Sequence, residues 1–212
     1  MIRGIGPIQT LQHLVPRPLV PVFLFVTYLG SARIILPGLV FLYWRWDPRR
    51  VAIVGSVALG AFALTLTLKN AFALPRPPAS LHLTYASGYG FPSGHALDST
   101  ATYGSLAAVL RSGTVLQRAL LAGALVGLVA LSRVVLGVHY PADVVAGIAV
   151  GLGYLLVVAY VLRWNVRDAL VVATGLAAAG VVVAGGDRES LLLLAVVLAA
   201  LLGWRQWGAD RV

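Results

Sequence analysis

The sequence predicts an all-α, polytopic membrane protein built as one helical bundle. Hydrophobic residues make up 59% of the 212 positions and charged residues only 11%, whereas a soluble domain usually carries about 25% charged residues. The mean hydropathy is +0.90. Several apolar runs approach the ~20 residues that a membrane-spanning helix needs, and they leave no room for a separate soluble domain. We therefore expect a single integral-membrane domain over residues 1–212.

The first 46 residues are the least regular part of the pattern. Residues 1–18 are punctuated by Pro and Gly and predict an interfacial arm, and residues 19–46 are apolar but interrupted by Gly30-Ser31, Arg33 and Pro37. One interpretation is a single tilted helix with a buried Arg33. The other places 19–29 along the membrane surface and starts a span near Ser31. The second is favoured, because an arginine near an interface reaches water more cheaply than one at mid-bilayer.

The later apolar runs are more regular, and they cover 51–74, 95–110, 115–136, 141–162, 170–184 and 191–204. The first of them is closed by Pro75-Arg76-Pro77-Pro78, which breaks a helix, and a polar loop over 79–92 follows. Pro141 suits the first turn of a helix. The last two runs are shorter than the ~20 residues of a span. The sequence thus predicts six core spans, with or without a seventh at the C-terminus.

The charge pattern indicates an orientation in the membrane. The net charge of +9 comes from arginines in short loops, which favours membrane orientation over nucleic-acid binding. An N-terminus outside the cell satisfies the positive-inside rule. It places Arg45, Arg49, Arg50, Arg111, Arg118, Arg163, Arg167, Arg205 and Arg211 in the cytoplasm, and Arg3, Arg17 and Arg188 outside. The absence of cysteine excludes a disulfide framework and a thiol nucleophile.

Three polar segments stand at the outer ends of the predicted spans under this orientation. The first contains Lys69 and Arg76-Pro77, the second is Pro92-Ser93-Gly94-His95, and the third contains Ser132-Arg133, His139 and Asp143. Ionisable groups at the edge of a membrane span are costly, so their default interpretation is functional. Together these residues supply cations, imidazoles, a carboxylate and a Gly-containing turn, which is what phosphoryl transfer through a histidine requires.

Each segment also has a structural interpretation. Lys69 and Arg76 lie two helical turns apart, and a helix that frays at Pro75 leaves Arg76 free to turn toward phosphate oxygens, but both are also acceptable as interfacial cations. Ser93 is either a helix cap or, with the Gly94 N–H, part of an anion site. His95 is either a first-turn structural residue or a proton donor. Asp98 either tunes His95 or bonds a neighbouring helix.

The third segment gives the clearest chemistry. Asp143 follows His139 by four residues, so one helical turn brings its carboxylate to the imidazole. Such a carboxylate fixes the tautomer and makes the other ring nitrogen a better nucleophile. An ordinary His–Asp pair at a helix start is the alternative, but it leaves Arg133 unexplained. The convergence of all three segments on one membrane side and one chemistry favours function.

The spacing of these residues resembles the three signature motifs of the type 2 phosphatidic acid phosphatase superfamily, over about residues 31–163. Residues 164–212 are expected to add C-terminal helices. The resemblance implies that His139 attacks phosphorus, that Asp143 orients His139, and that His95 protonates the leaving group and then activates water. It assigns phosphate binding to Lys69, Arg76, Ser93, Gly94 and Arg133. It implies neither a metal nor another cofactor.

The resulting prediction is an integral-membrane, metal-independent lipid phosphatase of the plasma membrane, with its site on the extracytoplasmic face. Its substrate partner is expected to be a lipid phosphate, with phosphatidic acid, phosphatidylglycerol phosphate and polyprenyl phosphate or diphosphate as candidates. A phosphotransferase that passes the phosphoryl group to an alcohol is the alternative, since the same phosphohistidine serves both. A transporter with a phosphate-binding vestibule is a more remote alternative.

Overall fold

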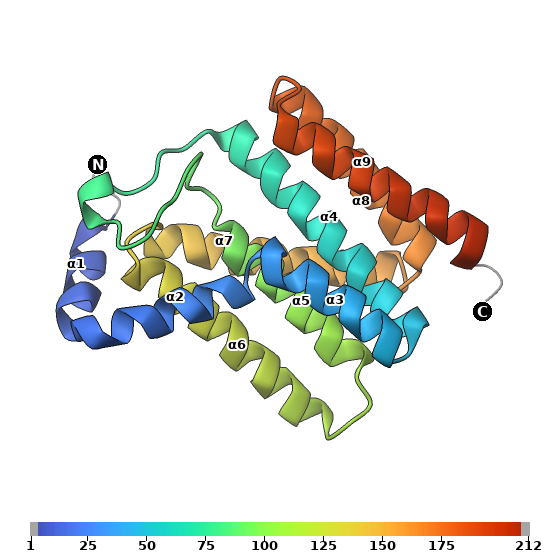
Figure 1. The fold of residues 1–212 in the computed structure, drawn as a ribbon, viewed down its shortest axis with the longest axis horizontal. Coiled ribbons are helices and arrows are strands. Elements are labelled where there is room, and N and C mark those ends of the chain that lie inside the picture. The colour runs from blue at the N-terminus through green and yellow to red at the C-terminus, as the bar shows by residue number, and fades with distance from the viewer. Residues whose placement is uncertain (1–3, 209–212) are drawn as a thin grey trace.

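The computed structural model describes residues 4–208, and it is all-helical over that range, as predicted (Figure 1). The helices are α1 (Ile5–Leu14), α2 (Val20–Leu29), α3 (Ala32–Arg45), α4 (Pro48–Phe72), α5 (Gly94–Val109), α6 (Val115–Val135), α7 (Pro141–Leu156), α8 (Val166–Val183) and α9 (Arg188–Gly203). Arg3 and Arg211, which enter the charge argument above, lie outside the described residues.

Five helices, α4, α6, α7, α8 and α9, are long and apolar enough to cross a membrane. The pair α2 and α3, bent by 56° at Gly30-Ser31, makes a sixth candidate when it is counted as one broken span. The 16-residue α5, which the sequence also predicts as a span, packs against α4, α6 and α7. Helices α8 and α9 begin earlier than predicted, at Val166 and Arg188, so both are closer to the length of a full span.

The predicted N-terminal arm contains helix α1. Its Ile8 is fully buried and belongs to the same apolar cluster as Ala130 and Val134 of α6. The side-chain amide of Gln12 donates to the backbone carbonyls of Leu81 and Val135, at 2.9 and 3.0 Å. Helix α1 therefore braces the end of the bundle at which α6 ends and the 79–92 loop returns.

In segment 19–46, α3 begins where the second of the two expected arrangements places it, next to Ser31. Ser31 is the residue before α3, and Arg33 in its first turn is exposed, so there is no continuous helix with a buried arginine. Helix α2 packs against α6, and α3 packs against α4. The bend between them therefore lies beside the core helices.

Helix α4 is the centre of the bundle, with α5 on one side and α8 on the other. Two glycines of α7 let it approach α5 closely. A Cβ at Gly147 would lie 2.5 Å from the Ser93 carbonyl oxygen, and one at Gly151 would lie 2.9 Å from the Leu97 carbonyl oxygen. This contact seats the start of α5 directly against the first turns of α7.

Candidate active site

The fold brings the three polar segments together at one end of the bundle, where α4 and α6 end and α5 and α7 begin (Figure 1). Lys69 lies in the last turn of α4, and Arg133 lies in the last turn of α6. Ser93 precedes α5, and Asp143 lies in the first turn of α7. The helix ends thus carry side chains from four parts of the sequence into one cluster.

His139 is held between a carboxylate and a guanidinium. Its Nδ1 lies 3.5 Å from Asp143 Oδ2, and its Nε2 lies 3.0 Å from NH1 of Arg76. Asp143 Oδ2 also accepts the backbone N–H of Tyr140 at 2.9 Å. Because arginine can only donate, this network assigns the proton to Nδ1 and leaves the Nε2 lone pair on the side of the cations. The imidazole thus has the tautomer that a nucleophile requires, with its lone pair directed at NH1 of Arg76.

Burial lowers the pKa of His139 well below its ordinary value, and the positive charges of Arg133, Lys69, Arg76 and His95 lower it further. Its side chain is 1% exposed. The neutral imidazole, which is the nucleophilic form, is therefore the favoured form near pH 7.

Arg76 is not free to turn, in contrast to the expectation from the sequence. Its Nε donates to the carbonyls of Ser87 and Gly88, both at 3.1 Å, and its NH2 donates to Ser87 at 2.9 Å. Its NH1 donates to the Val138 carbonyl at 3.0 Å. These bonds exist because the chain after Pro75 folds back, with the Gly90 N–H donating to the Leu74 carbonyl at 2.8 Å. Arg76 thus joins the 79–92 loop to His139.

The second segment is tied to the third through the backbone. The N–H of Ser93 donates to the Asp143 carbonyl at 2.9 Å. Ser93 makes no side-chain cap bond, and its fully buried Oγ has no hydrogen-bond partner within residues 4–208. Capping therefore does not account for this hydroxyl. A buried hydroxyl without a partner is costly, which is consistent with a place for a ligand oxygen.

Gly94 and Asp98 face the end of α4. A Cβ at Gly94 would lie 2.7 Å from Thr65 Cγ2 and 3.5 Å from Lys69 Cε, so the absence of a side chain lets the start of α5 reach Lys69. Thr65 Oγ1 donates to Asp98 Oδ1 at 2.8 Å, and both residues are buried. Asp98 therefore bonds a neighbouring helix, the second of its two expected roles.

Arg133 has a partner that sequence reasoning missed. Its NH1 donates to Thr27 Oγ1 of α2 at 2.7 Å, and the two side chains are 6% and 5% exposed. Its Nε is buried and has no hydrogen-bond partner among the described residues. A threonine in an otherwise apolar helix was the available signal, but nothing in the sequence connects positions 27 and 133.

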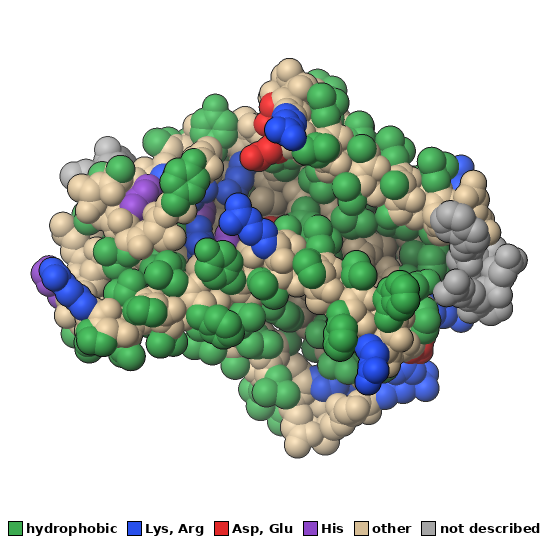
Figure 2. Space-filling view, in the orientation of Figure 1, with side chains coloured by type: hydrophobic (Ala, Val, Ile, Leu, Met, Phe, Trp, Pro, Cys, Tyr) green, Lys and Arg blue, Asp and Glu red, His purple; other side chains and the backbone are tan. Residues whose placement is uncertain are grey.

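The electrostatics of the cluster suit an anion. Lys69, Arg76 and Arg133 carry three positive charges, against the two carboxylates Asp98 and Asp143. Figure 2 shows blue and purple side chains together in the left half of the drawn face, while the blue groups at its lower right stand apart from histidines. The arrangement can bind a phosphoryl group, present a nucleophile to it and neutralise its equatorial oxygens.

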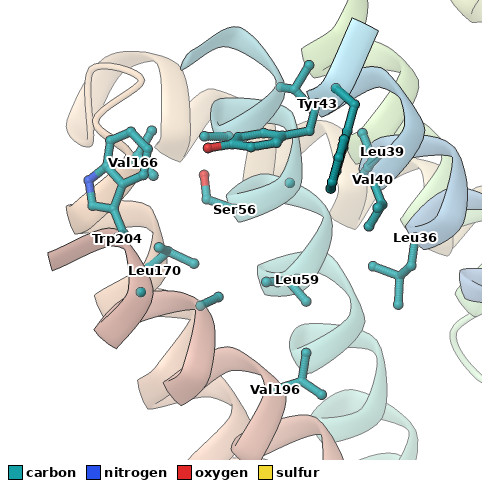
Figure 3. A pocket seen from close by; sticks show the side chains of 16 residues that line it. Leu36, Leu39, Val40, Tyr43, Ser56, Leu59, Val166, Leu170, Val196 and Trp204 are labelled. Atoms are coloured by element: carbon teal, nitrogen blue, oxygen red, sulfur yellow. The ribbon is translucent and has the colours of Figure 1, made fainter. Parts of the chain in front are cut away.

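A cavity with a volume of about 640 Å³ lies elsewhere, between α3, α4, α8 and α9. Figure 3 shows its apolar lining, with Tyr43 and Trp204 at its wall and the Ser56 hydroxyl as one of its few polar atoms. That hydroxyl already donates to the Ile53 carbonyl at 2.8 Å. None of the residues of the polar segments lines this cavity, so it is separate from the candidate active site.

The similarity to known proteins covers the helices that carry the polar segments. Residues 50–167 match the family model of the PAP2 superfamily. The chain is 31% identical over 141 residues to phosphatidylglycerophosphatase B of Bacillus subtilis, covering 60% of this chain and 67% of that protein. It is 37% identical over 106 residues to decaprenylphosphoryl-5-phosphoribose phosphatase of Mycobacterium tuberculosis, covering 49% of this chain and 56% of that protein.

A solved structure agrees with the fold. The crystal structure of the first transmembrane PAP2-type phosphatidylglycerolphosphate phosphatase from Bacillus subtilis superposes with a TM-score of 0.63 at 26% sequence identity. The match covers 76% of this chain and 84% of that one. The family match includes all three polar segments. It leaves outside it α1, α2, α3, α9 and all of α8 except its first two residues.

Proposed function

The chain belongs to the PAP2 superfamily of membrane phosphatases, and we propose that it hydrolyses the phosphate of a lipid through a phosphohistidine on His139. The observation that carries the mechanism is the placement of His139 between Asp143 and three cations, with Nε2 facing Arg76 at 3.0 Å. Lys69, Arg76, Ser93, the Gly94 N–H and Arg133 are proposed to hold the phosphoryl oxygens.

The first step is an in-line attack. His139 Nε2 forms a bond to phosphorus as the P–O bond to the lipid breaks, and a protonated His95 gives its proton to the leaving oxygen. Burial and the cations Arg133, Lys69 and Arg76 disfavour the imidazolium of His95, so this step requires the negative charge of the bound phosphate to favour it. For this step the NH1 of Arg76 must leave Nε2, since it occupies the lone pair that attacks. A phosphate oxygen is a charge-assisted acceptor and a stronger partner than a neutral imidazole. Substrate binding therefore supplies the reason for NH1 to exchange Nε2 for a phosphate oxygen, while Nε and NH2 of Arg76 keep their bonds to the 79–92 loop.

The second step returns the enzyme to its starting state. His95, now neutral, takes a proton from water, and the oxygen attacks phosphorus as the P–N bond to His139 breaks. The products are inorganic phosphate and a neutral His139. Asp143 stabilises the positive charge on His139 in the intermediate, at the Nδ1 that lies 3.5 Å from its carboxylate.

A lipid substrate suits the position of the cluster at the end of membrane-length helices. The 79–92 loop beside it exposes Tyr85 and Tyr89, which are 89% and 41% exposed, and Phe91 stacks edge-on against Phe72 with ring centroids 5.2 Å apart. Aromatic side chains are favoured at the membrane–water interface. Phosphatidylglycerol phosphate is the first candidate, because the relatives that share sequence and fold include phosphatases named for this lipid. Phosphatidic acid and polyprenyl phosphates or diphosphates are the others.

We place the site on the extracytoplasmic face. The end of the bundle opposite the polar segments carries the starts of α4, α6 and α8, and with them most of the loop arginines. The positive-inside rule assigns that end to the cytoplasm. The substrate is then a lipid of the outer leaflet.

The test is phosphate release by the purified protein from a panel of these lipids, with trapping of the phosphoenzyme. Label on His139 that is acid-labile and base-stable, activity in EDTA and inhibition by orthovanadate are the expected results. Oxygen from labelled water in the released phosphate identifies a hydrolase. Transfer to an added alcohol without such oxygen would identify the phosphotransferase instead. A strict requirement for added magnesium, or label that persists in His139→Ala, would overturn the mechanism.

A further inference from the structure

We propose that Thr27, on a helix outside the family match, is a positioning residue of the phosphate site and acts by fixing the guanidinium of Arg133. The inference rests on the proposed function, because the role of Arg133 is to hold the phosphoryl group. Thr27 Oγ1 accepts a hydrogen bond from Arg133 NH1 at 2.7 Å, and fewer than one tenth of either side chain is exposed.

The bond matters because Arg133 is buried. A buried guanidinium is costly unless its N–H groups have acceptors, and arginine itself offers none in return. Thr27 supplies an acceptor for NH1, whereas Nε has none within residues 4–208. One edge of the fork is thus held by protein while another N–H remains for a ligand oxygen. A fork fixed in this way loses little conformational freedom when it binds phosphate.

The position of Thr27 is itself fixed by the two helices that carry site residues. Tyr103 of α5 donates its hydroxyl to the Leu29 carbonyl at 2.6 Å. A Cβ at Gly30 would lie 3.2 Å from the His95 carbonyl oxygen and would overlap the Val129 side chain. The last turn of α2 therefore touches α5 beside His95 and α6 one turn before Arg133.

The experiment uses the full-length protein purified in detergent, with Thr27→Val to remove the acceptor at nearly constant shape and Thr27→Ser to restore it. Thr174→Val is the matched control, because Thr174 Oγ1 donates only to the Leu170 carbonyl of its own helix, α8. The measurements are the melting temperature, KM and kcat on phosphatidylglycerol phosphate, and the Kd of orthovanadate. Thr27→Val should weaken orthovanadate binding and lower kcat/KM, each by about tenfold or more.

Thr27→Ser should recover most of this loss, and Thr174→Val should show none of it. Thr27→Val is then also made in the Arg133→Ala variant. There it should change neither the Kd of orthovanadate nor kcat/KM any further, because Thr27 acts through Arg133. Equal losses in both backgrounds would mean a general structural role and would overturn the inference. So would orthovanadate binding by Thr27→Val that matches the wild type.

The outcomes separate this inference from the proposed function. A wild type that binds orthovanadate and releases no phosphate from any lipid would refute the proposed function, and the Thr27 comparison would still be decided by Kd. A wild type that releases phosphate while Thr27→Val behaves like it would refute only the inference. A wild type that does not bind orthovanadate would leave no phosphate site for Thr27 to serve and would refute both.

Discussion

The two ends of the bundle use arginine in opposite ways. At the site end, Arg76 and Arg133 are held by specific protein atoms, with Arg133 only 6% exposed. At the other end, Arg45, Arg49, Arg163, Arg167 and Arg205 are exposed. An exposed arginine reaches water at little cost, whereas a buried one needs partners. We therefore expect arginine to set the membrane orientation at one end and to bind a ligand at the other.

Aromatic residues sharpen this contrast. Trp44, Trp46, Trp164 and Trp204 all lie near the end with exposed arginines, and Arg50 there lies over the Trp46 ring at 5.9 Å while pairing with Asp47 at 2.9 Å. Tryptophan and arginine together are typical of a membrane interface. The site end instead gathers histidines, carboxylates and hydroxyls. Clustering of unlike polar groups, rather than positive charge alone, distinguishes the reactive end.

The largest expected effect is loss of the nucleophile. His139→Ala should abolish phosphate release, because His139 is the side chain proposed to bond to phosphorus. His95→Ala should be nearly inactive but should still accumulate phosphoenzyme from a substrate with a good leaving group, since His95 assists formation and breakdown without bonding to phosphorus. Single-turnover labelling measures both. Equal labelling of the two variants would contradict this division of roles.

Substitutions of arginine by lysine at the two ends of the bundle should have smaller effects, and they compare the two uses of arginine directly. Arg133→Lys should lower kcat/KM by about ten- to a hundredfold, because lysine cannot keep one contact to Thr27 while donating to phosphate, and a charge-assisted bond contributes roughly 1.5–3 kcal/mol. Arg76→Lys should act similarly. Arg167→Lys is the control at the opposite end, where only positive charge matters. A loss of the same size in Arg167→Lys would remove the distinction between the ends.

Much of this site was accessible from sequence because its polar groups interrupt apolar helices. Lys69, His95 and Asp143 each stand out where the surrounding residues are hydrophobic. The Arg76 clamp was not accessible, since its acceptors are the backbone carbonyls of Ser87, Gly88 and Val138, and every residue has a carbonyl. Thr27 and Arg133 are 106 positions apart, and only the packing of α2 on α6 joins them. For the α1 segment the sequence predicts only an interfacial arm, because the packing of α1 depends on burying Ile8 against α6.

A still smaller effect is expected in the pH dependence of kcat/KM, which should respond to Arg133 but not to remote arginines. Burial and neighbouring cations lower the pKa of His139 below its usual ~6.5, so the acid limb of kcat/KM that arises from His139 should lie below that pH. Removing one of those cations makes the charged imidazolium of His139 less unfavourable and raises its pKa, so Arg133→Gln should move the acid limb to higher pH. Arg167→Gln should not. Comparing variants on one substrate cancels the ionisation of the substrate, and an unmoved limb in Arg133→Gln would contradict the coupling.

The mildest change tests which end faces the cell exterior. The chain contains no cysteine, so Ser80→Cys and Ser112→Cys each introduce a single thiol at an exposed serine, the first in the loop beside the site and the second between α5 and α6 at the opposite end. If the arginine-rich end is cytoplasmic, a membrane-impermeant thiol reagent should label Ser80→Cys in intact cells and Ser112→Cys only after the membrane is opened. Labelling both variants in opened membranes controls for reactivity. The reverse pattern in intact cells would put the site on the cytoplasmic face and move its lipid substrate to the inner leaflet, while Arg76 and Arg133 would keep their contacts with His139 and Thr27.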